Sequence, residues 1–356
     1  MSREPSVPRS REARASSPAP RGRGYFDIVE PDGPGLVVAG WLFPIEGRVE
    51  RYRVSVEGAP AVHSARYRRD DVVDSYGRFF PCDDAGFSAR VPIAGSDLLD
   101  WRTIVVAGEG REGDVAVQSI RFKTGYASGL PLPPRGLRVR VVGYDDERSY
   151  WLQALKTFGE FAGALDRHSA LGPRARLLDW GCGCGRVIGL MRRHLEGVVF
   201  AGCDIDAEAV EWCRRNLPDH DFAVLSPLPP SPFEPDSFDA VTGNSVLTHL
   251  ERSVQAAWLR EIRRILKPGG LLFASVNGPF AARFASAPEV EALRRDGIAD
   301  AAPDAALDGI APAGYYRSVY LTREYVTREF SRILEVVEYR EQAMSNFQDL
   351  VVLRKP

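Results

Sequence analysis

The stretch Leu177–Val187, LLDWGCGCGRV, decides the fold of this chain. Leu177 and Leu178 belong to an apolar strand, a run of glycines allows a tight turn and close approach of a ligand to the backbone, and Arg186 opens a helix. The glycines are Gly181, Gly183 and Gly185. A strand, a glycine turn and a helix in this order predict the nucleotide-binding crevice of an α/β sheet. The dinucleotide fingerprint Gly-x-Gly-x-x-Gly would need a glycine at position 186, where the chain has arginine.

A second apolar run, Val198–Asp204, ends in a carboxylate about twenty residues beyond the glycines, where acidic residues face a ribose. Asp204 can accept both ribose hydroxyls, so we expect it to hold a nucleoside. Asp206 precedes an amphipathic helix and is better explained as its N-cap. The segment Phe222–Leu225 forms the next short strand, and Phe238–Val241 the one after it.

These elements, with Asp179 ahead of the glycines and the run DSFDAVTGNSVLTHL at 236–250, resemble the class I methyltransferases that use S-adenosylmethionine (SAM). The resemblance implies an α/β fold with a doubly wound, mainly parallel, seven-stranded sheet whose last two strands form an antiparallel edge. It also implies that the glycine loop holds the methionine end of the cofactor, S-adenosyl-L-methionine. The candidate cofactor-binding residues are Asp179, Gly181, Cys182, Gly183, Gly185, Asp204, Ile205, Ser226 and Asn244. Many relatives have an acid near this strand end that contacts the adenine amino group. This chain has Leu225 and Ser226 at the matching place, so the contact is either made by the backbone and Ser226 or absent.

Substrate chemistry should take place at the carboxyl end of the strand that leads into Thr242–His249. Asn244 and Ser245 lie at that strand end, and His249 follows about one helical turn later. A lone histidine is more often structural, but a base near neutral pKa would help to remove a proton from a hydroxyl acceptor. The insertion 279–321 is too long for a simple connection and should fold over the acceptor side. Within it, two candidate substrate-binding residues accompany Ser245, and these are Tyr315 and Tyr316.

The chain ahead of the glycine loop divides into three predicted parts. Residues 1–24, rich in Pro, Arg and Ser, read as a disordered tail, and 125–142 read as a Pro/Gly linker into the methyltransferase domain at 143–356. Between them, residues 25–124 show short alternating apolar runs and no convincing helix, which predicts an antiparallel β-sandwich. This part loosely resembles a module found beside bacterial enzymes of surface glycans. Its aromatic side chains either stack on sugars or pack inside the module, and the candidates are Trp41, Tyr67, Tyr76 and Phe79.

Composition excludes few function classes. The 356 residues include 46 basic and 48 acidic side chains, and the net charge of -2 does not favour nucleic acid as a partner. No apolar run is long enough to span a membrane, and the N-terminus lacks the apolar core of a secretory signal, so we expect a cytoplasmic protein. The spacing Cys182-x-Cys184 is too short for a usual zinc site, and we expect no metal.

The module at 25–124 serves recognition, spacing or dimerisation, so a homodimer is one alternative.

Three functions stay open from sequence. The first is transfer of a methyl group to a hydroxyl, less favourably an amine, of a glycan or secondary-metabolite acceptor by in-line displacement. The second is a nicotinamide-dependent oxidoreductase on a similar sheet, against which Arg186 and the terminal strand pair count. The third is a catalytically silent binding protein on the methyltransferase fold.

Overall fold

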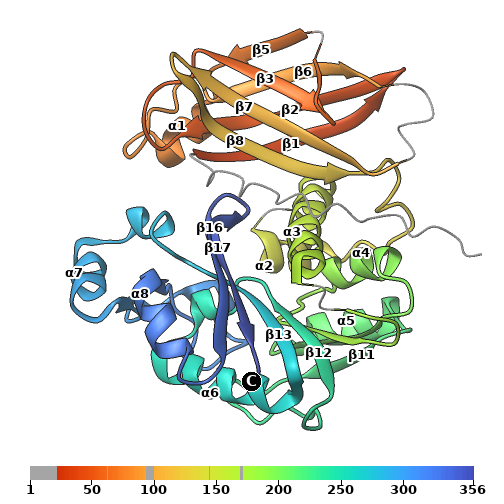
Figure 1. Ribbon diagram of the computed structural model, residues 1–356, viewed down its shortest axis with the longest axis vertical. Coiled ribbons are helices and arrows are strands. Elements are labelled where there is room, and N and C mark those ends of the chain that lie inside the picture. The colour runs from red at the N-terminus through yellow and green to blue at the C-terminus, as the bar shows by residue number, and fades with distance from the viewer. Residues whose placement is uncertain (1–21, 62, 94–99, 144, 169–170) are drawn as a thin grey trace, which may run out of the picture.

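The computed structural model describes residues 22–61, 63–93, 100–143, 145–168 and 171–356. The predicted disordered tail lies outside the described residues up to position 21. Figure 1 shows an upper part made mainly of β-strands and a lower part built on one large twisted sheet, with α2 (Arg135–Val142) and α3 (Glu147–His168) between them. In the described residues, no helix combines the length and apolarity that a membrane span requires.

Two four-stranded antiparallel sheets form the upper part of the chain. The first sheet has the order β1 (Gly22–Asp32), β2 (Gly35–Pro44), β6 (Gly86–Pro92) and β5 (His63–Tyr67). The second has the order β4 (Ala59–Pro60), β3 (Arg51–Val56), β7 (Arg102–Gly110) and β8 (Gly113–Phe122). Side chains from both sheets meet in one apolar core, as Leu36 and Val38 of the first and Val54 and Ile104 of the second illustrate. The period-two pattern therefore predicted this part correctly as strands.

Two details of this part differ from the sequence prediction. Strand β1 begins at Gly22, inside the segment 1–24 that we expected to be disordered. Gly22 is buried, and a Cβ at this position would lie 2.6 Å from the Cβ of Ala116 in β8. A short helix, α1 (Asp70–Tyr76), occupies a stretch in which we expected none. Its two leading aspartates suit a helix N-terminus, and Val72 anchors it in an aromatic cluster with Phe80. The helix was missed because only one of its residues is buried.

The lower part is a seven-stranded, mostly parallel sheet. Its strand order is β11 (Asp221–Val224), β10 (Val199–Asp204), β9 (Arg176–Trp180), β12 (Phe238–Gly243), β13 (Leu266–Val276), β17 (Gln348–Arg354) and β16 (Glu335–Met344). The five strands from β11 to β13 are parallel, and β17 pairs antiparallel with both of its neighbours. The terminal antiparallel edge was therefore predicted correctly.

Helices cover both faces of this sheet, because its central strands are apolar on both sides. Leu177 belongs to one core and Leu178 to the other, which is what alternation along a doubly buried strand requires. The helices on the first face are α3 (Glu147–His168), α4 (Arg186–His194) and α5 (Ala207–Asn216). The opposite face carries α6 (Arg252–Ile265), α8 (Arg323–Tyr325) and the π-helical turn η5 (Val326–Phe330).

The expected Pro/Gly linker at 125–142 is only partly a linker. Its second half is the helix α2 (Arg135–Val142), which starts directly after Pro134 and ends at Gly143 in the left-handed conformation. The helix forms because Leu137 packs on Cys184 and Ala209 of the lower part, a tertiary contact that sequence periodicity does not reveal. Moreover, α3 contacts β1 and β8 as well as α4, so the upper and lower parts share one continuous core.

The insertion 279–321 carries little regular structure. Its elements are η3 (Ala281–Phe284), α7 (Ala287–Asp296), β14 (Ile298–Ala299), η4 (Ala305–Leu307) and β15 (Tyr320–Leu321). Helix α7 begins with a capping box between Ser286 and Glu289. None of its described side chains is buried, so it projects at the edge of the lower part in Figure 1.

Candidate functional site

A cavity of about 270 Å³ lies at the carboxyl ends of β9, β10 and β12. This is where ligands bind in open α/β sheets, because the loops after the strands diverge there. Most of the residues singled out from sequence line it: Asp179, Gly181, Cys182, Gly183, Asp204, Ile205, Asn244, Ser245, His249, Tyr315 and Tyr316. One cavity therefore contains both the expected cofactor residues and the expected acceptor residues.

The glycine loop is tied to the end of β10 by Asp204. The Oδ2 atom of Asp204 accepts a hydrogen bond from the Gly183 N–H at 2.8 Å, and Oδ1 accepts one from the Asp206 N–H at 2.9 Å. Burial raises the pKa of Asp204, and the backbone bonds oppose that rise. Each carboxylate oxygen can accept a second bond, so the side chain keeps acceptor capacity toward the cavity. As predicted, Asp206 caps α5 and accepts from the N–H groups of Glu208 and Ala209.

Asp179 is the more deeply buried carboxyl of the cavity wall. It is 4% exposed and accepts a hydrogen bond from the Thr242 hydroxyl at 2.9 Å. Burial raises its pKa to about 7, against the opposing effects of the Thr242 bond and of the Arg186 charge. Because this pKa lies near 7, a charge that a ligand brings next to Asp179 shifts the balance between its protonated and ionised forms.

Two of the candidate cofactor residues do not line the cavity. Gly185 has φ +67°, and a Cβ there would lie 2.6 Å from Leu217, so this glycine serves the turn and its packing on the side away from the cavity. Ser226 is exposed, while its neighbour Leu225 is in the cavity wall. Successive side chains of an extended chain point in opposite directions, so the Leu225 side chain, and not that of Ser226, faces the cavity.

Helix α2 is a part of the cavity wall that sequence reasoning missed. Arg140, Val141 and Val142 all line the cavity. Arg140 forms ion pairs with Asp206 at 3.0 Å and Glu208 at 2.7 Å, which fasten α2 to the start of α5. Val141 lies so close to Gly183 that a Cβ on the glycine would approach it to 3.0 Å. The signal in the sequence was Pro134 followed by apolar residues four apart, Leu137 and Val141, which is typical of a helix start.

His249, in the turn η2 (Leu247–His249), lies among acceptor-side residues of the wall. Its ring stacks on Tyr316 with 4.0 Å between centroids and 12° between planes. Its Nδ1 lies 3.0 Å from the Arg317 carbonyl oxygen, which can only accept, so Nδ1 carries the proton and Nε2 keeps a lone pair. Burial lowers the pKa of His249, although the Arg317 carbonyl and Asp304 at 3.8 Å act against that. The imidazole is therefore neutral at pH 7.

The other acceptor-side candidates are held by the protein itself. The Tyr315 hydroxyl donates to the Pro227 carbonyl oxygen at 2.6 Å, the same oxygen that Trp258 Nε1 bonds at 2.9 Å. The Ser245 hydroxyl donates to Gln348 at 3.1 Å, and its backbone has the strained value φ +57°. The tyrosine thus offers its ring rather than its hydroxyl to the cavity.

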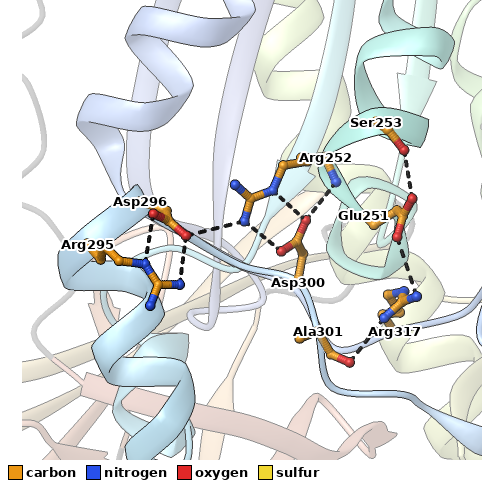
Figure 2. Close-up of polar contacts among 8 residues, drawn as sticks. All are labelled: Glu251, Arg252, Ser253, Arg295, Asp296, Asp300, Ala301 and Arg317. Carbon is orange, nitrogen blue, oxygen red and sulfur yellow. Dashed lines mark hydrogen bonds and ion pairs between the residues drawn. The ribbon is translucent and has the colours of Figure 1, made fainter.

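A polar network fastens the insertion to the start of α6 (Figure 2). Asp300 accepts bonds from the Arg252 backbone N–H, Nε and Nη2, each at 2.9 Å. Arg317 reaches Glu251 at 3.4 Å and donates to the Ala301 carbonyl at 3.0 Å. Because the Arg317 backbone also bonds the imidazole, this network fixes the wall in which His249 lies.

Comparison with known proteins identifies the lower part. Residues 178–274 match the family model described as a methyltransferase domain. The ubiquinone biosynthesis O-methyltransferase of Xanthomonas campestris pv. campestris (strain B100) is 35% identical over 119 residues, which is 32% of this chain and 48% of that protein. The malonyl-[acyl-carrier protein] O-methyltransferase of Herminiimonas arsenicoxydans is 33% identical over 107 residues, 30% of this chain and 38% of that protein. The chain thus spans about half or less of the curated relatives that it matches.

Solved structures include similar proteins at lower identity. A SAM-dependent methyltransferase from Methanosarcina mazei superposes with a TM-score of 0.42 at 19% identity, covering 53% of this chain and 96% of that one. Geranyl diphosphate C-methyltransferase from Streptomyces coelicolor A3(2), solved with S-adenosyl-L-homocysteine, superposes with a TM-score of 0.41 at 14% identity. The match covers 64% of this chain and 83% of that one.

The chain therefore contains a methyltransferase domain of the class I SAM-dependent type, and the resemblance read from the glycine loop is confirmed. The cofactor expected from that resemblance, S-adenosyl-L-methionine, is confirmed with it.

Proposed function

We propose that this chain, which carries a methyltransferase domain, moves the methyl group of S-adenosyl-L-methionine to a hydroxyl oxygen of a small-molecule or glycan acceptor. The observation that carries the proposal is that a single cavity joins Asp204 and the glycine loop to a neutral His249 with a free Nε2 lone pair. Both curated relatives named above are called O-methyltransferases, which supports oxygen as the acceptor atom.

The residues of the cavity fit this cofactor. Gly181 has φ +73°, and a Cβ there would lie 2.4 Å from Val246, so only glycine leaves the backbone open at this point. Asp204 would hold the two ribose hydroxyls, and Leu225 and Ile205 would offer apolar surface to the base. Asp179 and the loop would hold the methionine end. Asn244 would contact the cofactor at the end of β12.

When bound, the cofactor supplies a methyl group on a positively charged sulfur. The protein holds the acceptor hydroxyl in line with that methyl, so that the new C–O bond forms as the C–S bond breaks and its electron pair stays on sulfur. His249 Nε2 takes the hydroxyl proton, and the Arg317 carbonyl and Asp304 stabilise the imidazolium that results. Positioning can lower the barrier by about 7–11 kcal/mol, whereas a general base adds about a hundredfold to ten-thousandfold in rate.

Tyr316 and Tyr315 would form the acceptor wall, with Ser245 at its floor. The stacked ring of Tyr316 both orients His249 and offers an aromatic face to a ring-shaped acceptor. A flat face of this kind suits a sugar or an aromatic secondary metabolite.

The division of the chain belongs to the same proposal. The two N-terminal sheets, 25–124, are a β-sandwich for recognition of a glycan or for dimerisation, and 143–356 is the catalytic domain with the substrate-selecting insertion 279–321. The protein acts in the cytoplasm, on a small molecule or glycan and without nucleic acid.

Isothermal titration of S-adenosyl-L-homocysteine, and separately of NADH, into the full chain tests the proposal. We expect micromolar binding of the first ligand only. A matched control is Asp236→Ala, because Asp236 is a surface acid that pairs with Lys355 at 2.6 Å, whereas Asp204→Ala should lose the affinity. Binding of NADH alone would replace the proposal by an oxidoreductase, and binding of neither would leave a silent scaffold.

A further inference from the structure

Four arginines surround a second hollow, of about 370 Å³, on the lower part of the chain. Three of them lie in the second half of α6, the fourth follows η5, and one apolar side chain completes the lining: Arg260, Arg263, Arg264, Arg332 and Ile333. Strand β13 begins directly after α6 and runs parallel to β12. The arginine hollow therefore lies at the end of the sheet opposite to the cofactor cavity, and methyl transfer does not account for it.

Two of the four guanidinium groups are held in place by acids. Nε and Nη2 of Arg264 donate to the two carboxylate oxygens of Glu261 at 2.9 and 2.6 Å. Glu261 is 6% exposed and also accepts from the backbone N–H and the hydroxyl of Ser231, at 2.8 and 2.6 Å. Arg332 lies 2.5 Å from Glu329. A guanidinium has five N–H donors, so each of these arginines is positioned in advance and keeps donors for a further acceptor.

The other two cations are not balanced by an acid. Arg260 and Arg263 are exposed, and neither forms an ion pair within the part of the chain that the structure describes. They lie three residues apart on α6, and Arg264 follows Arg260 by four, which are the spacings at which like charges on a helix repel one another. An anion bound among these side chains would remove that repulsion.

The chemistry of the lining indicates which anion fits. Guanidinium groups pair with phosphate oxygens in a planar, bidentate geometry and stay charged at physiological pH. Because Arg264 and Arg332 already have acids, the two arginines without one are balanced by two negative charges, which a phosphate monoester carries and a carboxylate does not. Ile333 offers apolar surface to the carbon part of such a molecule. The net charge of -2 provides no general attraction for a polyanion, so the attraction is local to the hollow.

We propose that the arginine hollow is a second ligand site, which binds a small phosphorylated molecule through its dianionic phosphate group. Arg264 and Arg332 are the donors positioned in advance, and Arg260 and Arg263 supply the two unbalanced charges. The site is separate from the cofactor cavity, and the inference does not rest on the proposed function. A phosphate in a lipid headgroup has the same chemistry, and the experiment distinguishes the two sources.

Calorimetry with two probes on the full chain tests the charge of the ligand. The probes are phenyl phosphate, a dianion at pH 8, and benzoate, which carries one negative charge on the same ring. We expect the wild type to bind phenyl phosphate with saturation and at least tenfold more tightly than benzoate, because the second charge adds a charge-assisted interaction. Titrations with sodium chloride at equal ionic strength correct for screening.

The double variant Arg260→Gln/Arg263→Gln tests the location of the site. It should bind phenyl phosphate about tenfold more weakly than the wild type. The matched control is Arg294→Gln/Arg295→Gln, which removes two exposed arginines from the last turn of α7 and should keep the wild-type affinity. Thermal unfolding of both variants shows that they fold, since all four side chains are exposed.

The comparison of the two probes on the wild type needs no variant. Equal affinity for phenyl phosphate and benzoate would overturn the inference, as would an unchanged affinity in Arg260→Gln/Arg263→Gln or an equal loss in the α7 control. Sedimentation with phosphatidylcholine vesicles that contain phosphatidic acid provides the second arm. Binding to these vesicles without binding of phenyl phosphate would replace the ligand site by a membrane-contacting surface, and binding of neither would show that the arginines are only solvated.

Discussion

The Gly183 N–H donates a hydrogen bond of 2.8 Å to the Asp204 carboxylate, which locks the glycine loop to the neighbouring strand. Asp204 therefore has two tasks, since the oxygens that would receive a ribose also hold the loop in shape. Loss of the Asp204 side chain should therefore lower the affinity for the cofactor more than loss of a residue that touches only the ligand.

We predict that Asp204→Ala lowers the affinity for S-adenosyl-L-homocysteine at least tenfold, because a charge-assisted hydrogen bond to a ligand contributes about 1.5–3 kcal/mol. His249→Ala should leave that affinity within twofold, since the imidazole contacts Tyr316 and Arg317 on the acceptor side. Titration calorimetry of both variants measures the difference. Equal losses in the two variants would contradict these roles.

Affinity for the same ligand should rise with pH between about 5.5 and 7.5. Asp179 has a pKa raised by burial to about 7, and it must lose its proton before it can accept from an ammonium group. Binding below pH 7 therefore releases a proton, which appears as a dependence of the measured enthalpy on the ionisation enthalpy of the buffer. Asp204, whose pKa burial also raises, titrates in the same direction.

Asp179→Asn separates the two carboxyls. It should bind more weakly at pH 8 and lose most of the pH dependence, because the amide does not ionise. A pH profile unchanged in this variant would assign the titration to Asp204 instead.

Asp300→Ala should lower the free energy of unfolding by about 1 kcal/mol and the melting temperature by roughly 1–2 °C. Asp300 caps the first turn of α6 from the insertion and is 13% exposed at its side chain, while its partner Arg252 is 47% exposed, so solvent screens part of the pair (Figure 2). Thermal unfolding measures the change.

Arg295→Ala is the control for this prediction, because Arg295 pairs on the surface with Asp296 on the same helix and is 66% exposed. It should melt with the wild type. A loss as large as that of Asp300→Ala would mean that the whole network, rather than the cap, stabilises the insertion.

The sheet and the glycine loop could be predicted because strands buried on both faces read as unbroken apolar runs. The run Val198–Asp204 became β10 almost residue for residue, and Asp206 could be recognised as a cap from its position before α5. Both are local properties of the chain. Most of the predicted site residues line the cavity because ligands of open α/β sheets bind at the carboxyl ends of the strands, where these residues lie.

The remaining parts of the site depend on contacts that are distant in sequence. Helix α2 is stabilised by Leu137 and Arg140, whose partners lie about fifty to seventy residues away along the chain. The burial of Arg186 runs against the ordinary preference of arginine for the surface, so no propensity predicts it. Which of Leu225 and Ser226 faces the cavity is likewise set by the fold and not by the local sequence.

With any acceptor that the chain methylates, His249→Gln should lower kcat about a hundredfold to ten-thousandfold and leave the affinity for S-adenosyl-L-homocysteine unchanged. The base works as neutral imidazole, and burial lowers the pKa of His249 below its usual 6.5, so wild-type kcat should be flat at neutral pH and fall as the pH drops below that value. The glutamine can keep a bond to the Arg317 carbonyl and the packing against Tyr316, but it accepts no proton. The pH dependence of kcat, measured for both proteins with saturating cofactor, provides the check.

Tyr316→Leu serves as the control, since it removes the stacked ring and keeps the base, and it should retain the acid limb of the profile. If His249→Gln also retained that limb, the proton would leave by another group and His249 would only shape the cavity.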